Sequence, residues 1–341
     1  MGSVGRVATA VVAAVAVAAV STPADAAPAD RYDTTTAVGV HNAYDKAKYP
    51  YFADALDSGA SLVELDVWTN VFGSPWRVAH SNPVGNDNNC ANAADASALR
   101  TGPTDHDLGG CLADMKAWHD AHPGHRPVLV KVEMKDGFND KGGRGPDEFD
   151  ALVRSHLGDA VFGPGDLAGT HATLDDAVRT DGWPARSALA GKFLFELIPG
   201  TVEENNPLDK LWTDQEYATH LRDLAGQGRL AEATAFPAVH GAEAGDPRER
   251  YAQDLRPWFV VFDGDASAFV AGAIDTAWYD RNHYLVVMTD AQNVAPAIDA
   301  VKPTEAEALA RVDALARQHA SFATADWYPL PNVLQTVVAR G

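Results

Sequence analysis

The sequence predicts an α/β fold in which parallel strands alternate with helices within one domain. Two observations carry this prediction. Short apolar runs rich in β-branched or aromatic residues recur along the chain, and stretches with helical spacing of apolar residues lie between them. Strands that alternate with helices pair in parallel. No internal repeat and no stretch rich in Pro, Gly or Ser divides the chain, so we expect a single domain.

Seven runs have the composition of buried strands, because each is apolar and is bounded by Gly, Pro, Asp or Asn. They cover residues 36–40, 62–67, 128–133, 193–197, 258–262, 284–288 and 322–325. A shorter run, 77–79, ends at His80.

The clearest helix is predicted over residues 303–320. Its residues Leu309, Val312, Leu315, Ala316 and His319 fall on one face at helical spacing, and a proline lies near its start. Four further helices are expected at residues 112–121, 147–156, 174–179 and 215–227.

Residues 1–26 have the order of a secretory signal peptide. Arg6 gives a positive start, residues 7–20 form an unbroken small-apolar run, and Ala24-Asp25-Ala26 is a small-x-small cleavage site. The run is shorter than the roughly 20 residues that span a bilayer, and no later segment is apolar enough to do so. We therefore expect a secreted protein without a transmembrane segment, whose folded part is residues 27–341.

The charge balance excludes one class of partner and allows another. A formal net charge of -20 argues against nucleic acid, because phosphate backbones are neutralised by Lys and Arg. It also argues against tight electrostatic adhesion to anionic membranes. An acidic protein can still bind divalent cations.

The chain has two cysteines, Cys90 and Cys111. Two cysteines in an exported chain usually pair, because the compartment is oxidising. One disulfide that closes the loop between them is therefore predicted, and two free buried thiols are the alternative.

Charged and polar residues interrupt or end the predicted strands. They are His41, Asn42, Glu64, Asp66, His80, Lys131, Glu133, Lys135 and Asp263. Side chains two residues apart point to the same face of a strand, so Glu64 and Asp66 share a face. Carboxylates within apolar strands are costly to bury unless they are paired or bind a metal. Several of them at the carboxyl ends of parallel strands are typical of a barrel enzyme.

Four of these residues form a set of oxygen ligands. Asn42, Glu64, Asp66 and Glu133 offer one amide oxygen and three carboxylates, which suits Ca²⁺ in preference to Mg²⁺. The set contains no cysteine, which argues against zinc.

Each residue also has a simpler interpretation. Glu64 with Asp66 is compatible with a structural salt bridge, and Lys131 and Lys135 could simply neutralise Glu133. A single histidine is more often structural than catalytic, and we interpret the ten histidines other than His41 and His80 as surface residues. The order of the whole set along the chain favours a common site.

This ordered set resembles the phospholipase C-like phosphodiesterase superfamily. Within it the chain is similar to calcium-dependent phosphatidylinositol-specific phospholipases C of streptomycete type. Segments 39–44, 63–68, 78–81 and 132–135 carry the resemblance, which runs from Thr36 to about Tyr328. It implies a TIM-type (β/α)8 barrel, irregular or incompletely closed in some members, and a phosphoric diester hydrolase of the phospholipase C type.

The resemblance also implies residue roles. His41 and His80 match the two active-site histidines, and Asn42, Glu64, Asp66 and Glu133 match the calcium ligands. A metal-independent branch has an arginine in place of the ion. In the implied reaction the inositol 2-hydroxyl attacks the phosphodiester with Glu64 as general base. His80 protonates the departing diacylglycerol oxygen and His41 stabilises the phosphoryl oxygens, although these two roles could be exchanged.

The implied substrate is phosphatidylinositol in a lipid interface, and a monomer is expected. Substrate-binding candidates are Lys131, Lys135, Asp263 and Trp327. Aromatic residues in segments 50–52, 72–76 and 327–328 are candidates for contact with the interface, with core packing as the alternative. Glu196 inside the run 193–197 favours plain phosphatidylinositol over polyphosphorylated forms.

Three rival functions stay open at this point. A glycerophosphodiester phosphodiesterase shares the barrel, but that family typically has His-Arg-Gly where this chain has His41-Asn42-Ala43, and His-Asp where it has His80-Ser81. A sphingomyelinase D-like lipid phosphodiesterase is a weaker rival. A non-catalytic barrel that binds a head group is the alternative of a different class.

Overall fold

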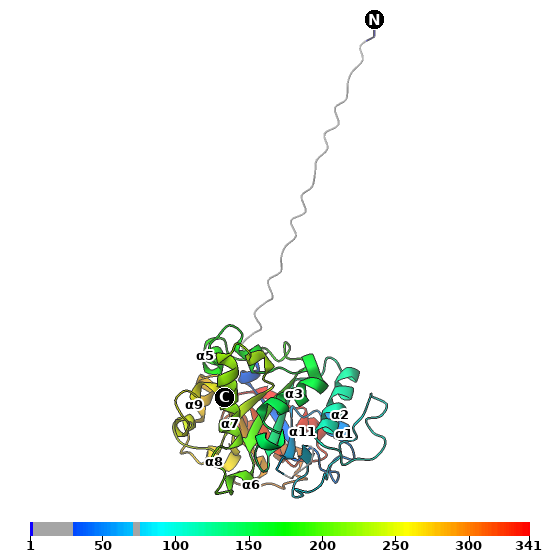
Figure 1. Ribbon diagram of the computed structural model, residues 1–341, viewed down its shortest axis with the longest axis vertical. Helices are drawn as coiled ribbons and strands as arrows, with labels where there is room; N and C mark the ends of the chain where they lie inside the picture. The colour runs from blue at the N-terminus through cyan, green and yellow to red at the C-terminus, as the bar shows by residue number, and fades with distance from the viewer. Residues whose placement is uncertain (3–29, 71–75) are drawn as a thin grey trace.

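Eight parallel strands close into a barrel in the computed structural model, which describes residues 1–2, 30–70 and 76–341 (Figure 1). The predicted signal peptide, residues 1–26, lies outside the described residues from residue 3 onward. The strands are β1 Thr35–Val40, β2 Leu62–Trp68, β3 Arg77–Val78, β4 Val128–Met134, β5 Phe193–Pro199, β6 Ala235–His240, β7 Val261–Asp265, β8 Leu285–Thr289, β9 Phe322–Ala325 and β10 Val337–Ala339.

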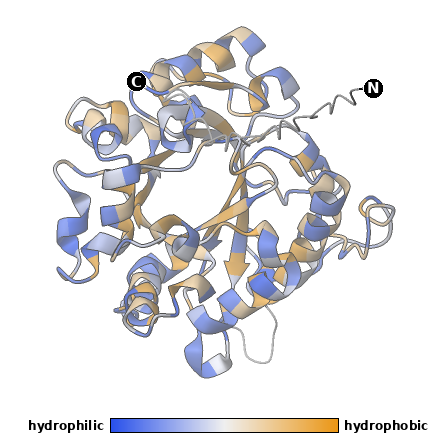
Figure 2. Cartoon of the chain, turned by 90° about the horizontal axis from the view of Figure 1, so that it is seen from above, coloured by the Kyte–Doolittle hydropathy of each residue, from blue (hydrophilic) through white to orange (hydrophobic). Residues whose placement is uncertain are grey.

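The helices follow the strands and lie outside the barrel (Figure 2). They are α1 Phe52–Asp57, α2 Leu108–Ala121, α3 Pro146–Leu157, α4 Pro164–Ala168, α5 Leu174–Asp181, α6 Thr201–Glu204, α7 Thr213–Gly226, α8 Ala266–Val270, α9 Thr276–Arg281, α10 Glu305–Ala316 and α11 Pro331–Leu334.

The barrel order is β1-β2-β4-β5-β6-β7-β8-β9, and β9 pairs in parallel with β1. Between β1 and β2 the pairing is short, because the register joins only Gly39 with Leu62 and Val40 with Val63. β3 and β10 are antiparallel additions to β2 and β1 respectively. The predicted TIM-type α/β fold is therefore confirmed.

Burial on both faces explains why most strands could be predicted as continuous apolar runs. Every residue of β1, β2, β5 and β9 is buried, between the barrel interior and the surrounding helices. Figure 2 shows the strands of the barrel as a mainly hydrophobic inner ring, with helices around it whose outer faces are largely hydrophilic.

Two strands escaped prediction and one is displaced. β6 contains Pro237, which lacks an N–H and is atypical of a central strand. The strand changes its pairing partner after this residue, since Ala235–Pro237 pairs with β5 and Ala238–His240 pairs with β7. β10 is short and partly exposed. The run 258–262 becomes a strand only from Val261, because Arg256–Trp258 forms a 3-10 turn.

The helix predicted over 303–320 is shorter than expected. α10 begins after Thr304, which makes a capping box with Glu307, and it ends at Ala316. His319 has a φ of 61°, in the left-handed region, so it cannot continue the helix. The segment between β6 and β7 contains only 3-10 turns and no α-helix, so the barrel is irregular.

The predicted disulfide is confirmed. Cys90 and Cys111 are bonded and tie the loop that follows β3 to the start of α2. Among the described residues, no helix is both long and apolar enough to cross a membrane.

Candidate active site at the carboxyl end of the barrel

The strand register stacks polar side chains in two layers near the carboxyl end of the barrel. Glu64 pairs with Lys131, which pairs with Glu196 on the next strand. These three residues and Asp263 form the deeper polar layer. Two residues further along, Asp66 pairs with Glu133 and forms the upper layer, nearer the barrel mouth.

The three predicted carboxylate ligands converge. Glu64, Asp66 and Glu133 each place one oxygen within 4.8 Å of the others. Asp66 is 1% exposed, so its carboxylate needs a nearby cation or a bound proton to offset its burial. Asn42 is adjacent, since its backbone N–H donates to Glu64 Oε2 at 3.2 Å. This convergent all-oxygen set fits a hard cation such as Ca²⁺.

Two buried lysines neutralise these acids. Lys131 Nζ lies 2.9 Å from Asp263 Oδ2 and 3.5 Å from Glu64 Oε1. Lys135 Nζ lies 2.8 Å from Glu133 Oε1 and 3.2 Å from Asp66 Oδ2. These residues were predicted as substrate-binding, together with Asp263, but the structure engages all three in buried ion pairs rather than in the walls of an open pocket.

The buried carboxylic acids of the site differ in the direction of their pKa shifts. Burial raises the pKa of Asp66 to about 7, and the charges of Glu133 and Glu64 add to the effect while Lys135 opposes it. Burial also acts to raise the pKa of Glu64, but His41 and Lys131 outweigh it, so the net shift is downward. Glu64 is therefore ionised at neutral pH and able to accept a proton. Burial, and then the charge of Asp263, raises the pKa of Glu196 well above its usual value.

His41 lies between two carboxylates. Its Nε2 is 3.3 Å from Glu64 Oε2, and its Nδ1 is 3.1 Å from Asp326 Oδ1. Burial lowers the pKa of His41, but Glu64 and Asp326 outweigh this and raise it to about 9. The ring is therefore cationic at neutral pH.

Asp326 is a site residue that the sequence reasoning missed. Its Oδ1 also contacts Lys48 Nζ, which donates to the backbone oxygen of His41 at 3.1 Å. Burial acts to raise the pKa of Asp326, but its bonds to His41 and Lys48 lower it to about 2. Asp326 directly follows β9, so its position at a strand end was the available signal.

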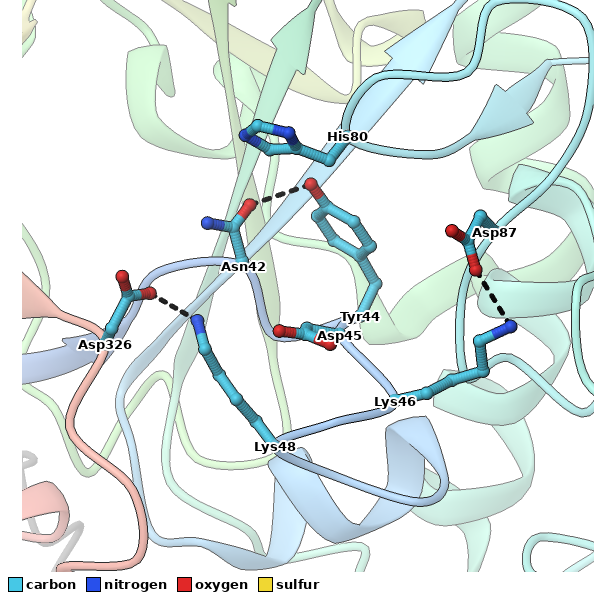
Figure 3. Close-up of a pocket in the computed structure, with 8 residues that line it drawn as sticks. All are labelled: Asn42, Tyr44, Asp45, Lys46, Lys48, His80, Asp87 and Asp326. Atoms are coloured by element: carbon cyan, nitrogen blue, oxygen red, sulfur yellow. Dashed lines mark hydrogen bonds and ion pairs between the residues drawn. The ribbon is translucent and has the colours of Figure 1, made fainter.

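An open pocket of about 410 Å³ lies at the barrel mouth, lined by Asn42, Tyr44, Asp45, Lys46, Lys48, His80, Asp87 and Asp326 (Figure 3). His80 is exposed, and its Nδ1 lies 2.8 Å from Ser81 Oγ. Tyr44 donates from its hydroxyl to Asn42 Oδ1 at 2.7 Å. His80, one of the two predicted active-site histidines, therefore lines the same pocket as Asn42 of the oxygen-ligand set.

The interpretation of the other ten histidines as surface residues is wrong for several of them, since only His122 among the ten is exposed and the side chain of His220 is 11% exposed. His125 is buried. His240, the last residue of β6, is half-buried, with its Nδ1 2.8 Å from Glu204 Oε1 and its Nε2 3.9 Å from Asp263 Oδ1. β6 was not predicted, so the strand-end position of His240 was not visible in the sequence.

Three of the five described aromatic residues expected at the interface belong to the core. Phe52 and Trp327 are fully buried, so neither faces a lipid surface and Trp327 does not line the pocket. Trp76 is also buried, and segment 71–75 lies outside the described residues. Tyr51 and Tyr328 are partly exposed.

Comparisons with known proteins agree with this geometry. A family model described as "Phosphoinositide phospholipase C, Ca2+-dependent" matches residues 97–227, a span that includes Glu133 but none of the other converging carboxylates. No curated protein matches the chain. Among solved structures, a Ca²⁺-dependent phosphatidylinositol-specific phospholipase C from Streptomyces antibioticus is 72% identical. That match covers 92% of this chain and 100% of the other, with a TM-score of 0.91.

A calcium-dependent phosphoinositol-specific phospholipase C from a Pseudomonas species is 23% identical, covers 94% of this chain and 99% of the other, and has a TM-score of 0.67. At this identity the likeness shows the fold alone. The S. antibioticus match spans nearly the whole described barrel at high identity, and the chain therefore belongs to the family of calcium-dependent phosphatidylinositol-specific phospholipases C.

Proposed function

We propose that this protein cleaves phosphatidylinositol between the glycerol oxygen and phosphorus, and releases diacylglycerol and an inositol phosphate. The observation that carries the proposal is the convergence of Glu64, Asp66 and Glu133 beside an open pocket that His80 lines. His41 lies against the same carboxylates, 3.3 Å from Glu64. A barrel that only binds a head group would need neither the oxygen-ligand set nor both histidines.

Asn42, Glu64, Asp66 and Glu133 are the proposed calcium ligands. The convergence of the three carboxylates and the burial of Asp66 support this assignment. When bound, Ca²⁺ supplies positive charge that lowers the pKa of a hydroxyl and neutralises charge at phosphorus.

The chain's own residues handle the protons. Glu64, ionised at neutral pH, accepts the proton of the inositol 2-hydroxyl while the oxygen of that hydroxyl bonds to phosphorus. The bond from phosphorus to the glycerol oxygen breaks, and His80 donates a proton to that oxygen. The exposed position of His80 suits a leaving group that arrives from a lipid surface.

His41 is the proposed electrostatic partner of the phosphoryl oxygens. Its cationic ring is suited to stabilise negative charge and unsuited to accept a proton. Asp326 and Lys48 act as positioning residues, because Asp326 holds the imidazole at Nδ1 and Lys48 holds both Asp326 and the backbone of His41.

A set of exposed apolar side chains at the mouth supports action at a lipid surface. Val84 lies between the pocket residues His80 and Asp87 in the chain, and Val202, Leu208, Leu211 and Val301 lie in segments that follow the carboxyl ends of β5 and β8. Each of the five is more than a third exposed. We call these five residues the apolar rim. It replaces the aromatic segments predicted from the sequence, and contact through it does not depend on positive charge.

The apolar rim is tested with Leu208→Glu and, as a matched control, Val337→Glu. Leu208 is 88% exposed on the rim, whereas Val337 is 41% exposed on β10, which pairs with the amino end of β1. Leu208→Glu should weaken sedimentation with phosphatidylinositol vesicles, and Val337→Glu should not. Equal effects of the two changes would contradict the assignment of the rim.

Export as a monomer is part of the same proposal. The disulfide between Cys90 and Cys111 supports an oxidising compartment. Recovery of the protein in culture medium, cleaved after residue 26, tests export, and light scattering of the purified protein tests the monomer.

The function is tested by incubation with phosphatidylinositol, glycerophosphoinositol and sphingomyelin, each with calcium or with a chelator. Calcium-dependent release of diacylglycerol from phosphatidylinositol alone is the expected result. Release of free inositol and glycerol phosphate from glycerophosphoinositol, or of choline from sphingomyelin, would assign the site to one of the rival phosphodiesterases.

A further inference from the structure

Lys135 already places a positive charge within the proposed calcium-ligand set. Its ammonium lies 2.8 Å from Glu133 Oε1 and 3.2 Å from Asp66 Oδ2, so one cation contacts two of the three converging carboxylates. The side chain is 8% exposed, and water therefore screens this charge poorly. Lys131 differs, because its ion pairs are with Glu64 and Asp263 in the deeper layer.

The backbone of Lys135 is fixed, so only its side chain is free to move. Its N–H donates to the backbone oxygen of Val67 at 2.8 Å, and its carbonyl accepts from the N–H of Glu203 at 3.0 Å. Gly200 packs against it so closely that a Cβ at that position would lie 2.5 Å from Lys135 Cα. The four-carbon side chain, by contrast, is flexible.

A calcium ion held by Glu64, Asp66 and Glu133 must lie within a few ångströms of each oxygen, in the same space that the ammonium contacts. Two cations at that separation repel strongly in a buried site. We propose that Lys135 is an internal counter-cation that occupies the calcium site of the metal-free protein and that calcium displaces. Its removal should therefore strengthen calcium binding. The inference rests on the proposed calcium ligands.

Lys135→Met tests this competition in the full-length protein. Isothermal titration with calcium should give a dissociation constant lower by about tenfold or more than that of the wild type, because a competing charge is gone. Thermal denaturation in chelator should show a lower melting temperature, because buried acids lose their counter-cation. Lys116→Met, which removes an exposed ion pair with Asp120, is the matched control and should change neither quantity.

The affinity for calcium must rise while the melting temperature in chelator falls. If Lys135 were only structural, the variant would bind calcium no better than wild type while melting earlier, and a folded Lys135→Met protein with unchanged or weaker binding overturns the inference. Lys135→Arg, which keeps the charge, should not gain affinity.

A second measurement needs no variant. Acetylation of the wild-type protein with an amine-reactive reagent, read by mass spectrometry, should label Lys135 more strongly with calcium than with chelator, while Lys116 stays unchanged. Equal or lower labelling of Lys135 in calcium-bound protein overturns the inference. If wild-type and Glu133→Gln proteins bind calcium equally, the proposed ligand set itself is wrong, which separates that failure from failure of the competition.

Discussion

Replacing Lys131 with methionine removes the cation of the deeper polar layer. Lys131 is 4% exposed and lies among Glu64, Glu196 and Asp263, all of which are at most 2% exposed. At an effective dielectric constant of 20, the ammonium attracts the carboxylates of Asp263 at 2.9 Å and Glu64 at 3.5 Å by roughly 5 to 6 kcal/mol each. Most of this attraction offsets the free energy that it costs to remove the charges from water. Loss of one partner from such a buried group costs about 3–5 kcal/mol in the free energy of unfolding.

The partners of Lys131 are not equivalent to it. Asp263→Asn leaves the ammonium beside Glu64 and Glu196, so we expect a smaller cost of about 1–2 kcal/mol. Both substitutions remove the same ion pair. The free energy of unfolding lost by the double variant should therefore be about 1–3 kcal/mol smaller than the sum of the losses of the two single variants. The free energy of unfolding of Lys116→Met, on the exposed face of α2, should lie within about 0.5 kcal/mol of that of the wild type.

Urea denaturation of the metal-free proteins at pH 7 and pH 5 measures these quantities. Without Lys131 the buried carboxylates have raised pKa values, so the folded state binds more protons than the unfolded state and stability falls as pH rises. The cost of Lys131→Met should therefore be smaller at pH 5. A cost below about 1 kcal/mol at pH 7, or one that grows toward pH 5, would refute the reasoning.

Three further predictions follow from the site and the loop beside it. His80→Ala should lower turnover by about 10²- to 10⁴-fold, the range for one general acid, with calcium affinity by calorimetry unchanged. The raised pKa of His41, about 9 against an ordinary 6.5, predicts stability that is fully present below pH 6.5 and lost as pH rises through 9. Thermal melts of metal-free protein should show this loss in wild type and not in His41→Gln. Replacement of Cys90 and Cys111 by serine opens a loop with a sequence separation of 21 and should cost about 3 kcal/mol in urea denaturation, whereas an unchanged midpoint would contradict that role.

The predictable part of the fold is the part whose signal is local. Strands buried on both faces are continuous apolar runs, and β9 was predicted with the bounds that it has. β6 depends instead on its neighbours, because it pairs with β5 up to Pro237 and with β7 from Ala238 onward. A proline in a central strand contradicts the local pattern, and only closure of the barrel makes the strand favourable.

The candidate site divides in the same way. Alternation along β2 placed Glu64 and Asp66 on one face, and the register then brought Glu133 to them. The aromatic residue Trp327 was misplaced because an aromatic residue at a strand end suits either a surface or a core, and the sequence does not show which elements cover it. Contacts between distant residues, such as that of His41 with Asp326, appear only after β1 and β9 pair.

The short pairing of β1 with β2 gives the barrel a seam. Val40 and Val63 form the last residue pair of this seam, and Asn42 follows one side of it while Glu64 and Asp66 lie on the other. A ligand held from both sides therefore resists local separation of the two strands. Amide exchange at the seam should slow when calcium binds, while exchange at the opposite side of the barrel, between β6 and β7, should not. The site that carries the chemistry would then also control how often the barrel opens.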